Sequence, residues 1–227
     1  MSEKAILKSA AVVSALSGLV ILLATIYPIA SYESQARQKY PQLISPVVEG
    51  QTTETLDKLD YTKASNWFVG GETANFSTSK VGFYSLTIPK LGVEKATVAL
   101  GGEDLSSNLI QYPGTANPGK IGNTVVFGHS ILPQFFNPED YMSIFSTLPI
   151  LKKGDEIIID YDGITYKYTV ESLIEVLPTD IQVLDQRADD SYLSLITCVP
   201  PGHPLKPKRL IVRAKIIPPE NLANTQQ

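Results

Sequence analysis

The chain has few cysteines and histidines, the residues that bind zinc and, for cysteine, form disulfides. Its 227 residues include one cysteine and two histidines, widely separated in the sequence. A single cysteine forms no disulfide within the chain, and the clustered ligand spacing of a zinc site is missing. There is no phosphate-binding glycine loop, and the net charge of −4 indicates no basic surface for nucleic acid. The sequence therefore predicts no cofactor, no metal and no nucleic-acid partner.

One long stretch without charge is present, between Ser9 and Tyr32. As a helix it would extend for roughly 36 Å, more than the ~30 Å hydrocarbon core of a bilayer. Lys4 and Lys8 precede it, so the positive-inside rule predicts a cytoplasmic N-terminus and an extracytoplasmic remainder. A cleaved signal peptide is the alternative, but the stretch exceeds the roughly 7–15 residues of a signal-peptide core. We expect residues 1–32 to be a cytoplasmic stub and a retained single-pass anchor in membrane lipid.

The rest of the chain divides by composition. Residues 33–80 are polar and predict an extracytoplasmic stalk or lead-in, in which Trp67 and Phe68 are interpreted as packing residues. Residues 81–218 contain short β-rich runs, and residues 219–227 form a C-terminal tail. Strands are predicted at 83–88, 96–100, 124–127, 156–161, 165–176, 192–199 and 210–217, and helices at 104–110 and 138–148. This pattern predicts a mainly β fold, a single closed or nearly closed barrel with short helices.

The only cysteine, Cys198, ends an apolar β-rich run, and the next strand opens with Arg209. A lone cysteine is most often a small buried hydrophobe. A nucleophilic thiol needs a nearby base or positive charge. His129 follows a β-rich run and Gly128, so its backbone is held at a strand end, whereas His203 lies in a proline-rich loop. An unpaired thiol in an exported domain is exposed to oxidation, which favours a functional role for Cys198.

Three separated blocks resemble the sortases, membrane-anchored cysteine transpeptidases of bacterial cell surfaces. The blocks are Tyr-Pro-Gly-Thr-Ala-Asn-Pro-Gly-Lys-Ile-Gly-Asn at 112–123 leading into Gly128-His129, Leu-Ile-Thr-Cys at 195–198, and Arg-Leu-Ile-Val at 209–212. With Gly154-Asp155 before a β-rich hairpin, the resemblance covers roughly residues 83–217. It implies a sortase-like barrel of about eight strands.

The resemblance also implies roles for particular residues. Cys198 would be the nucleophile, His129 the acid and base, and Arg209 the group that stabilises the substrate and the oxyanion. Thr197 matches a position that the family uses in substrate binding. Arg213 lies four residues from Arg209 on one strand face, so spacing alone leaves both arginines open. The family's arginine-then-apolar pattern favours Arg209.

The activity implied is acyl transfer. The thiolate would cleave an LPXTG-like sorting signal near the C-terminus of an exported protein, forming a thioester. An amine of a cell-wall precursor or of a surface or pilin protein would then accept the acyl group. The alternatives are a membrane-tethered barrel that only binds surface proteins, and a cysteine hydrolase that uses water. A third is a transpeptidase of peptidoglycan stem peptides, a family that typically has glycine where this chain has Thr197.

Overall fold

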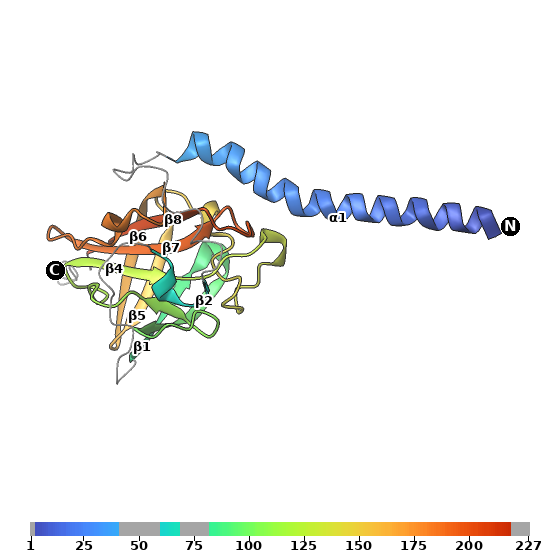
Figure 1. Cartoon of the computed structure of the whole chain (residues 1–227). Coiled ribbons are helices and arrows are strands. Elements are labelled where there is room, and N and C mark those ends of the chain that lie inside the picture. Colours follow the sequence, from blue (N-terminus) through green and yellow to red (C-terminus); the bar gives the residue numbers. More distant parts are fainter. Residues whose placement is uncertain (1–2, 41–59, 69–81, 219–227) are drawn as a thin grey trace, which may run out of the picture.

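The computed structural model describes residues 3–40, 60–68 and 82–218, so the predicted C-terminal tail lies outside the described residues. A long helix, α1 (Glu3–Lys39), extends from a β-barrel, with its N-terminus far from the barrel (Figure 1). Short 3-10 helices lie in the connections. They are η1 (Ala64–Asn66), η2 (Pro89–Leu91), η3 (Pro133–Phe135), η4 (Leu148–Ile150) and η5 (Ile181–Leu184).

Eight strands close the barrel in the order β1-β2-β3-β4-β7-β8-β6-β5, and β5 pairs with β1. The strands are β1 (Gly82–Ile88), β2 (Val93–Leu100), β3 (Leu109–Gln111), β4 (Gly122–Phe127), β5 (Glu156–Tyr161), β6 (Ile164–Val176), β7 (Ser191–Val199) and β8 (Lys208–Ile216). The pairs β2–β3 and β4–β7 are parallel and the others are antiparallel. The predicted mainly β barrel is confirmed.

The β5–β6 hairpin follows directly from its turn sequence. Asp162 and Gly163 connect Tyr161 to Ile164, and their φ angles are 52° and 74°. A two-residue turn with positive φ at both positions matches the right-handed twist of the paired strands, and Asp-Gly adopts it at low cost. The sequence alone therefore determined the register of this hairpin.

The prediction of helices at 104–110 and 138–148 is wrong, because both segments form turns. Within 104–110, the carboxylate of Asp104 accepts hydrogen bonds from Ser106 and Ser107 and closes a turn, after which β3 begins. Within 138–148, Asp140 likewise accepts a hydrogen bond from the backbone N–H of Met142, and the chain forms successive turns up to η4. Short acidic side chains that bond nearby backbone groups compete with helix formation.

The barrel sheet is packed on both of its faces near β4, β7 and β8. Along β7, Leu195 and Val199 belong to the cluster that fills the barrel, whereas Ile196 and Cys198 belong to a second cluster. Successive strand residues point to opposite faces, which explains this alternation. Tyr61, Ala64 and Trp67, from the segment 60–68 upstream of the barrel, belong to the second cluster as well. Cys198 is thus on a face that is covered by a segment outside the barrel.

The C-terminal turns of α1 are docked on the barrel. Ala36 and Tyr40 are buried among barrel residues, and the Tyr32 hydroxyl donates a 2.6 Å hydrogen bond to Glu175 of β6. Lys39 donates a 2.7 Å hydrogen bond to the carbonyl of Pro149. Residues 33–39, part of the predicted stalk, therefore continue the helix, and Ala36 and Tyr40 pack against the barrel.

Candidate active site

Parallel pairing of β4 and β7 places His129 beside Cys198. Phe127 is paired with Ile196, and the N–H of Gly128 continues the ladder by donating to the Ile196 carbonyl at 3.2 Å. Two residues further along each strand, the same register sets His129 next to Cys198, and neighbouring strands are about 4.8 Å apart. The Ser130 hydroxyl donates a 2.6 Å hydrogen bond to the Cys198 carbonyl, which holds the two strand ends together.

Packing explains why the residue before His129 is a glycine. A Cβ at Gly128 would lie 2.5 Å from the Phe145 ring and 2.6 Å from the Leu109 side chain, closer than any normal contact. The N–H of Phe145 also donates a 3.0 Å hydrogen bond to the His129 carbonyl. The backbone that carries His129 is therefore fixed on both sides.

Antiparallel pairing of β7 and β8 places Arg209 directly opposite Cys198. The cysteine on the central strand is thus flanked by His129 of the β4 end and by Arg209 of β8. Arg213 is paired with Ser194, four residues further along the same strands, or roughly 13 Å away. Its guanidinium donates to the Val183 carbonyl at 3.2 Å. Sequence spacing left both arginines open. The strand register places Arg209, and not Arg213, opposite Cys198.

The guanidinium of Arg209 is fully buried and mostly hydrogen-bonded to backbone carbonyls. Its Nε donates to the carbonyl of Trp67 at 3.1 Å, and Nη1 donates to the carbonyls of Lys206 and Lys208 at 2.8 and 3.1 Å. Nη2 is buried and has no hydrogen-bond partner among the described residues. A buried donor without a partner raises the free energy of the folded state. This nitrogen can therefore donate a favourable hydrogen bond to a substrate oxygen.

His129 lies in a dry environment. Its side chain is 2% exposed, and Nε2 has no hydrogen-bond partner among the described residues. Burial lowers the pKa of His129 to about 4, and the positive charge of Lys206 acts in the same direction. A neutral imidazole near pH 7 retains a nitrogen lone pair that can accept a proton.

Residues 60–68 cover this cluster. The Trp67 indole is fully buried, stacks on Phe127 at 5.1 Å and lies 5.8 Å from the His129 ring between centroids. The Tyr61 ring lies 5.2 Å from the Arg209 guanidinium, and the indole N–H of Trp67 donates to the Tyr61 carbonyl at 2.9 Å. Cys198 is left with 2% of its surface exposed. Trp67 is a packing residue, as predicted, but what it packs against is the candidate site.

A pocket of about 270 Å³ lies beside His129. Its lining comes from two loops, 129–135 after β4 and 202–206 between β7 and β8, together with Met142. His203 is one of the lining residues, and its Nδ1 accepts a hydrogen bond from the N–H of Leu205. The proline-rich loop is thus a wall of the pocket.

Thr197 lies on the other face of β7. It is fully buried, and its hydroxyl donates a 2.8 Å hydrogen bond to the Gly128 carbonyl. This bond ties β7 to the residue before His129. The role of Thr197 in substrate binding stays a prediction. Among the residues that the structure describes, no group of three or more His, Cys, Asp and Glu residues has the arrangement of a metal site.

The closed barrel brings a cysteine, a histidine and an arginine together on adjacent strands, an arrangement that suits thiol-dependent acyl transfer. A family model described as the Sortase domain matches residues 86–217, more than half of the chain. The chain belongs to the sortase family.

The relatives are distant in sequence. Sortase A of Bacillus anthracis is 26% identical over 162 residues, which cover 66% of this chain and 72% of that protein. Sortase A of Staphylococcus aureus is 33% identical over 103 residues, which cover 38% of this chain and 47% of that protein.

Solved structures agree on the fold. A Clostridium perfringens sortase D5 transpeptidase has a TM-score of 0.51 at 28% identity, covering 60% of this chain and 79% of its own. A lid mutant of sortase A from Corynebacterium diphtheriae has a TM-score of 0.52 at 29% identity, covering 61% of this chain and 72% of its own. Membership of this family supports transpeptidase activity in general.

Proposed function

We propose that this protein is a membrane-anchored cysteine transpeptidase that cleaves a sorting signal of exported proteins and joins the acyl part to an amine. The observation that carries the proposal is the position of Cys198 on β7, flanked in register by His129 and Arg209. A nucleophile, a neutral base and a buried cation with a free donor meet the needs of acyl transfer.

The first half-reaction forms a thioester. His129 takes the proton of the Cys198 thiol, and the sulfur attacks the backbone carbonyl of the sorting signal. Negative charge develops on the carbonyl oxygen, which accepts a hydrogen bond from Nη2 of Arg209. The C–N bond then breaks, and the imidazolium of His129 protonates the departing amine. The amine leaves with the downstream segment, and the acyl group stays on sulfur.

The second half-reaction restores the enzyme. An incoming amine attacks the thioester carbonyl while His129 accepts its proton. The tetrahedral intermediate expels the thiolate, and the proton on His129 returns to sulfur. The product keeps a peptide bond. If water takes the place of the amine, the same sequence of steps gives hydrolysis, so the acceptor alone separates the two activities.

Turnover requires that residues 60–68 move. Cys198 and His129 are each 2% exposed and Arg209 is fully buried, so a peptide carbonyl has little access to the sulfur while residues 60–68 are in place. We infer that the closed arrangement is the resting form, and that the sorting signal binds where Trp67 and Tyr61 now pack.

The proposed location is the membrane, with the barrel on the extracytoplasmic side. Among the described residues one helical stretch, Leu7–Lys39, is long and apolar enough to span a bilayer, with a mean hydropathy of 2.2 in its most apolar window. The window is unburied, so no protein surface covers its apolar side chains. Lys4 and Lys8 at its start support a cytoplasmic N-terminus.

The test uses the full chain in detergent micelles, a library of LPXTG-like peptides and an excess of a simple amine, followed by mass spectrometry. We expect peptide–amine products and a thioester on Cys198, both absent in Cys198→Ala. Cleavage with no amine capture would identify a hydrolase. A folded, thiol-intact protein that forms no thioester, even after Trp67→Ala has uncovered the site, would favour a non-catalytic binding module.

A further inference from the structure

The loop after His129 touches the apolar part of α1. Nε2 of Gln134 donates a 3.0 Å hydrogen bond to the carbonyl of Ala24, well inside the uncharged stretch of the helix. The adjacent Phe135 is 63% exposed, although phenylalanine is normally buried. Figure 1 shows this loop region on the side of the barrel from which α1 extends. An exposed aromatic residue therefore follows directly the residue that contacts a helix of membrane-spanning composition.

The position of Ala24 along α1 determines how deep this loop lies in a bilayer that α1 spans. Lys8 is the last charged residue before Ala24, and the helix between them rises by roughly 24 Å at 1.5 Å per residue. A hydrocarbon core of about 30 Å that begins at Lys8 therefore ends about four residues beyond Ala24. If the Lys8 side chain extends outward so that the core begins a turn earlier, Ala24 lies at the outer boundary. The loop therefore lies between about 6 Å inside the hydrocarbon core and its boundary with the headgroups, the depth at which the apolar side chains of interfacial segments are buried.

A second loop, in contact with the first, carries another exposed apolar side chain. Residues 202–206 face the His129 loop across the pocket, and a Cβ at Gly202 would lie 2.5 Å from the Leu132 side chain. The two loops are therefore in close contact. Leu205 in this second loop is 54% exposed.

We propose that loops 131–136 and 202–206 form a membrane-docking surface that places Phe135 and Leu205 at the boundary between the headgroups and the acyl chains of the outer leaflet. The pocket beside His129 then opens at the membrane surface. The occupant is the bilayer because the surface is continuous with α1, so this inference rests on the proposed membrane anchor. Docking of α1 on the barrel through Tyr32, Ala36 and Tyr40 holds the loops at this level, and a tethered surface needs little affinity of its own.

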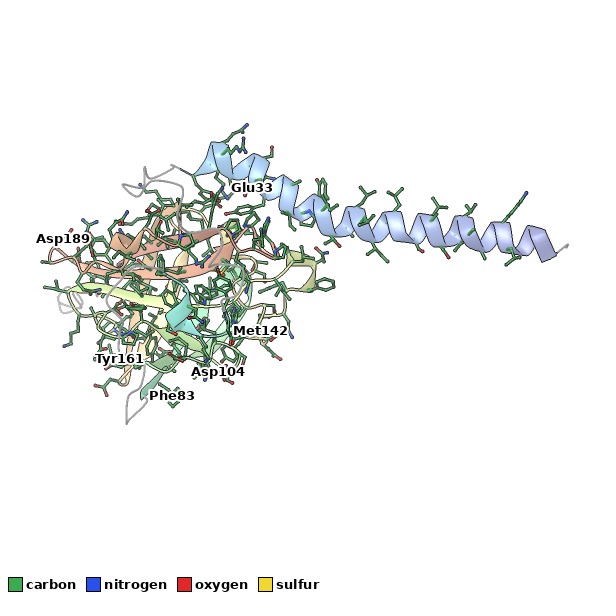
Figure 2. All side chains as sticks on the ribbon, viewed as in Figure 1. Glu33, Phe83, Asp104, Met142, Tyr161 and Asp189 are labelled. Atoms are coloured by element: carbon green, nitrogen blue, oxygen red, sulfur yellow. The ribbon has the colours of Figure 1, made fainter. Side chains whose placement is uncertain are left out.

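The experiment reads lipid contact rather than activity. The full chain carrying Cys198→Ala receives one new cysteine, either Phe135→Cys or Phe83→Cys, labelled with an environment-sensitive fluorophore. Phe83 is the matched control because it is 59% exposed, and Figure 2 shows it at an edge of the barrel away from α1. A third variant, Ile21→Cys in α1, reports whether the helix enters the bilayer. Each is reconstituted in phosphatidylcholine–phosphatidylglycerol vesicles with or without a lipid that carries a nitroxide quencher, placed shallow for positions 135 and 83 and deeper on the acyl chain for position 21.

We expect the nitroxide lipid to quench the label at position 135 at least threefold more than the label at position 83. Strong quenching at position 21 with equal, weak quenching at 135 and 83 would overturn membrane docking while leaving the anchor intact. Absence of quenching at position 21 would overturn the anchor and the docking together. A sheltered label at 135 that lipid quencher does not reach would instead indicate contact with a second copy of the chain, and would also overturn the proposal.

Discussion

Removing the indole of Trp67 should uncover Cys198. The side chain is fully buried, stacks on Phe127 and lies against His129. Truncation of a buried tryptophan to alanine costs about 3–5 kcal/mol. Residues 60–68 lie outside the barrel sheet, so most of this loss should fall on the closed arrangement of the segment rather than on the barrel. A loss of ~3 kcal/mol corresponds to a roughly 100-fold larger open population.

The assay is the rate at which a small maleimide labels Cys198 in the full chain, followed by intact mass in detergent micelles. We expect Trp67→Ala to raise this rate about 100-fold. Trp67→Phe, which keeps a ring against Phe127, should give a smaller increase. Labelling of the denatured proteins corrects for reagent differences, and urea unfolding monitors the barrel. The reasoning is refuted if Trp67→Ala labels within about threefold of the unsubstituted chain, because Trp67 would then not control access to the thiol.

Three further results are expected. Because burial lowers the pKa of His129 to about 4 from an unfolded value near 6.5, the folded form should lose up to roughly 3 kcal/mol as pH falls through this window. Urea midpoints of the unsubstituted chain should show this loss and those of His129→Asn should not; equal pH dependence would contradict the assignment. Arg209→Gln should lower turnover by about 10²–10³ in the peptide–amine assay, with Arg213→Gln much milder, and the reverse order would make Arg213 the functional arginine. Gly202→Ala should lower the melting temperature more than Gly154→Ala, since both have positive φ but only the first would place its Cβ 2.5 Å from a leucine side chain; equal shifts would show that the loop adapts.

Much of the barrel follows from local pattern. Seven of the strands were predicted near their observed positions because alternating or continuous apolar, β-branched runs are bounded by turn residues. The missed strand is β3, which has only three residues. Leu109 and Ile110 are extended because β2 and β4 lie on either side of them and bury both side chains. A segment this short carries too little periodicity of its own to reveal such pairing.

The candidate site, like the barrel, could be predicted from the sequence only in part. The motif blocks around Cys198, His129 and Arg209 were visible in the sequence because each lies at the end or the start of a β-rich run. Their proximity depends on the parallel β4–β7 register and the antiparallel β7–β8 register. Residues 60–68 gave no local signal of their role. Their contact with the site joins parts of the chain more than 60 residues apart, such as Trp67 and His129.

The sequence by itself determined the mainly β fold, the apolar N-terminal helix, the Asp162-Gly163 hairpin and the residue types available for chemistry, because each depends on neighbours within a few positions. Only the tertiary structure decided that Arg209 rather than Arg213 is paired with Cys198, and that Trp67 packs beside His129. It also decided that the loop after His129 meets α1 at Ala24. These features arise from strand register and long-range packing, which depend on how the whole chain closes into a barrel.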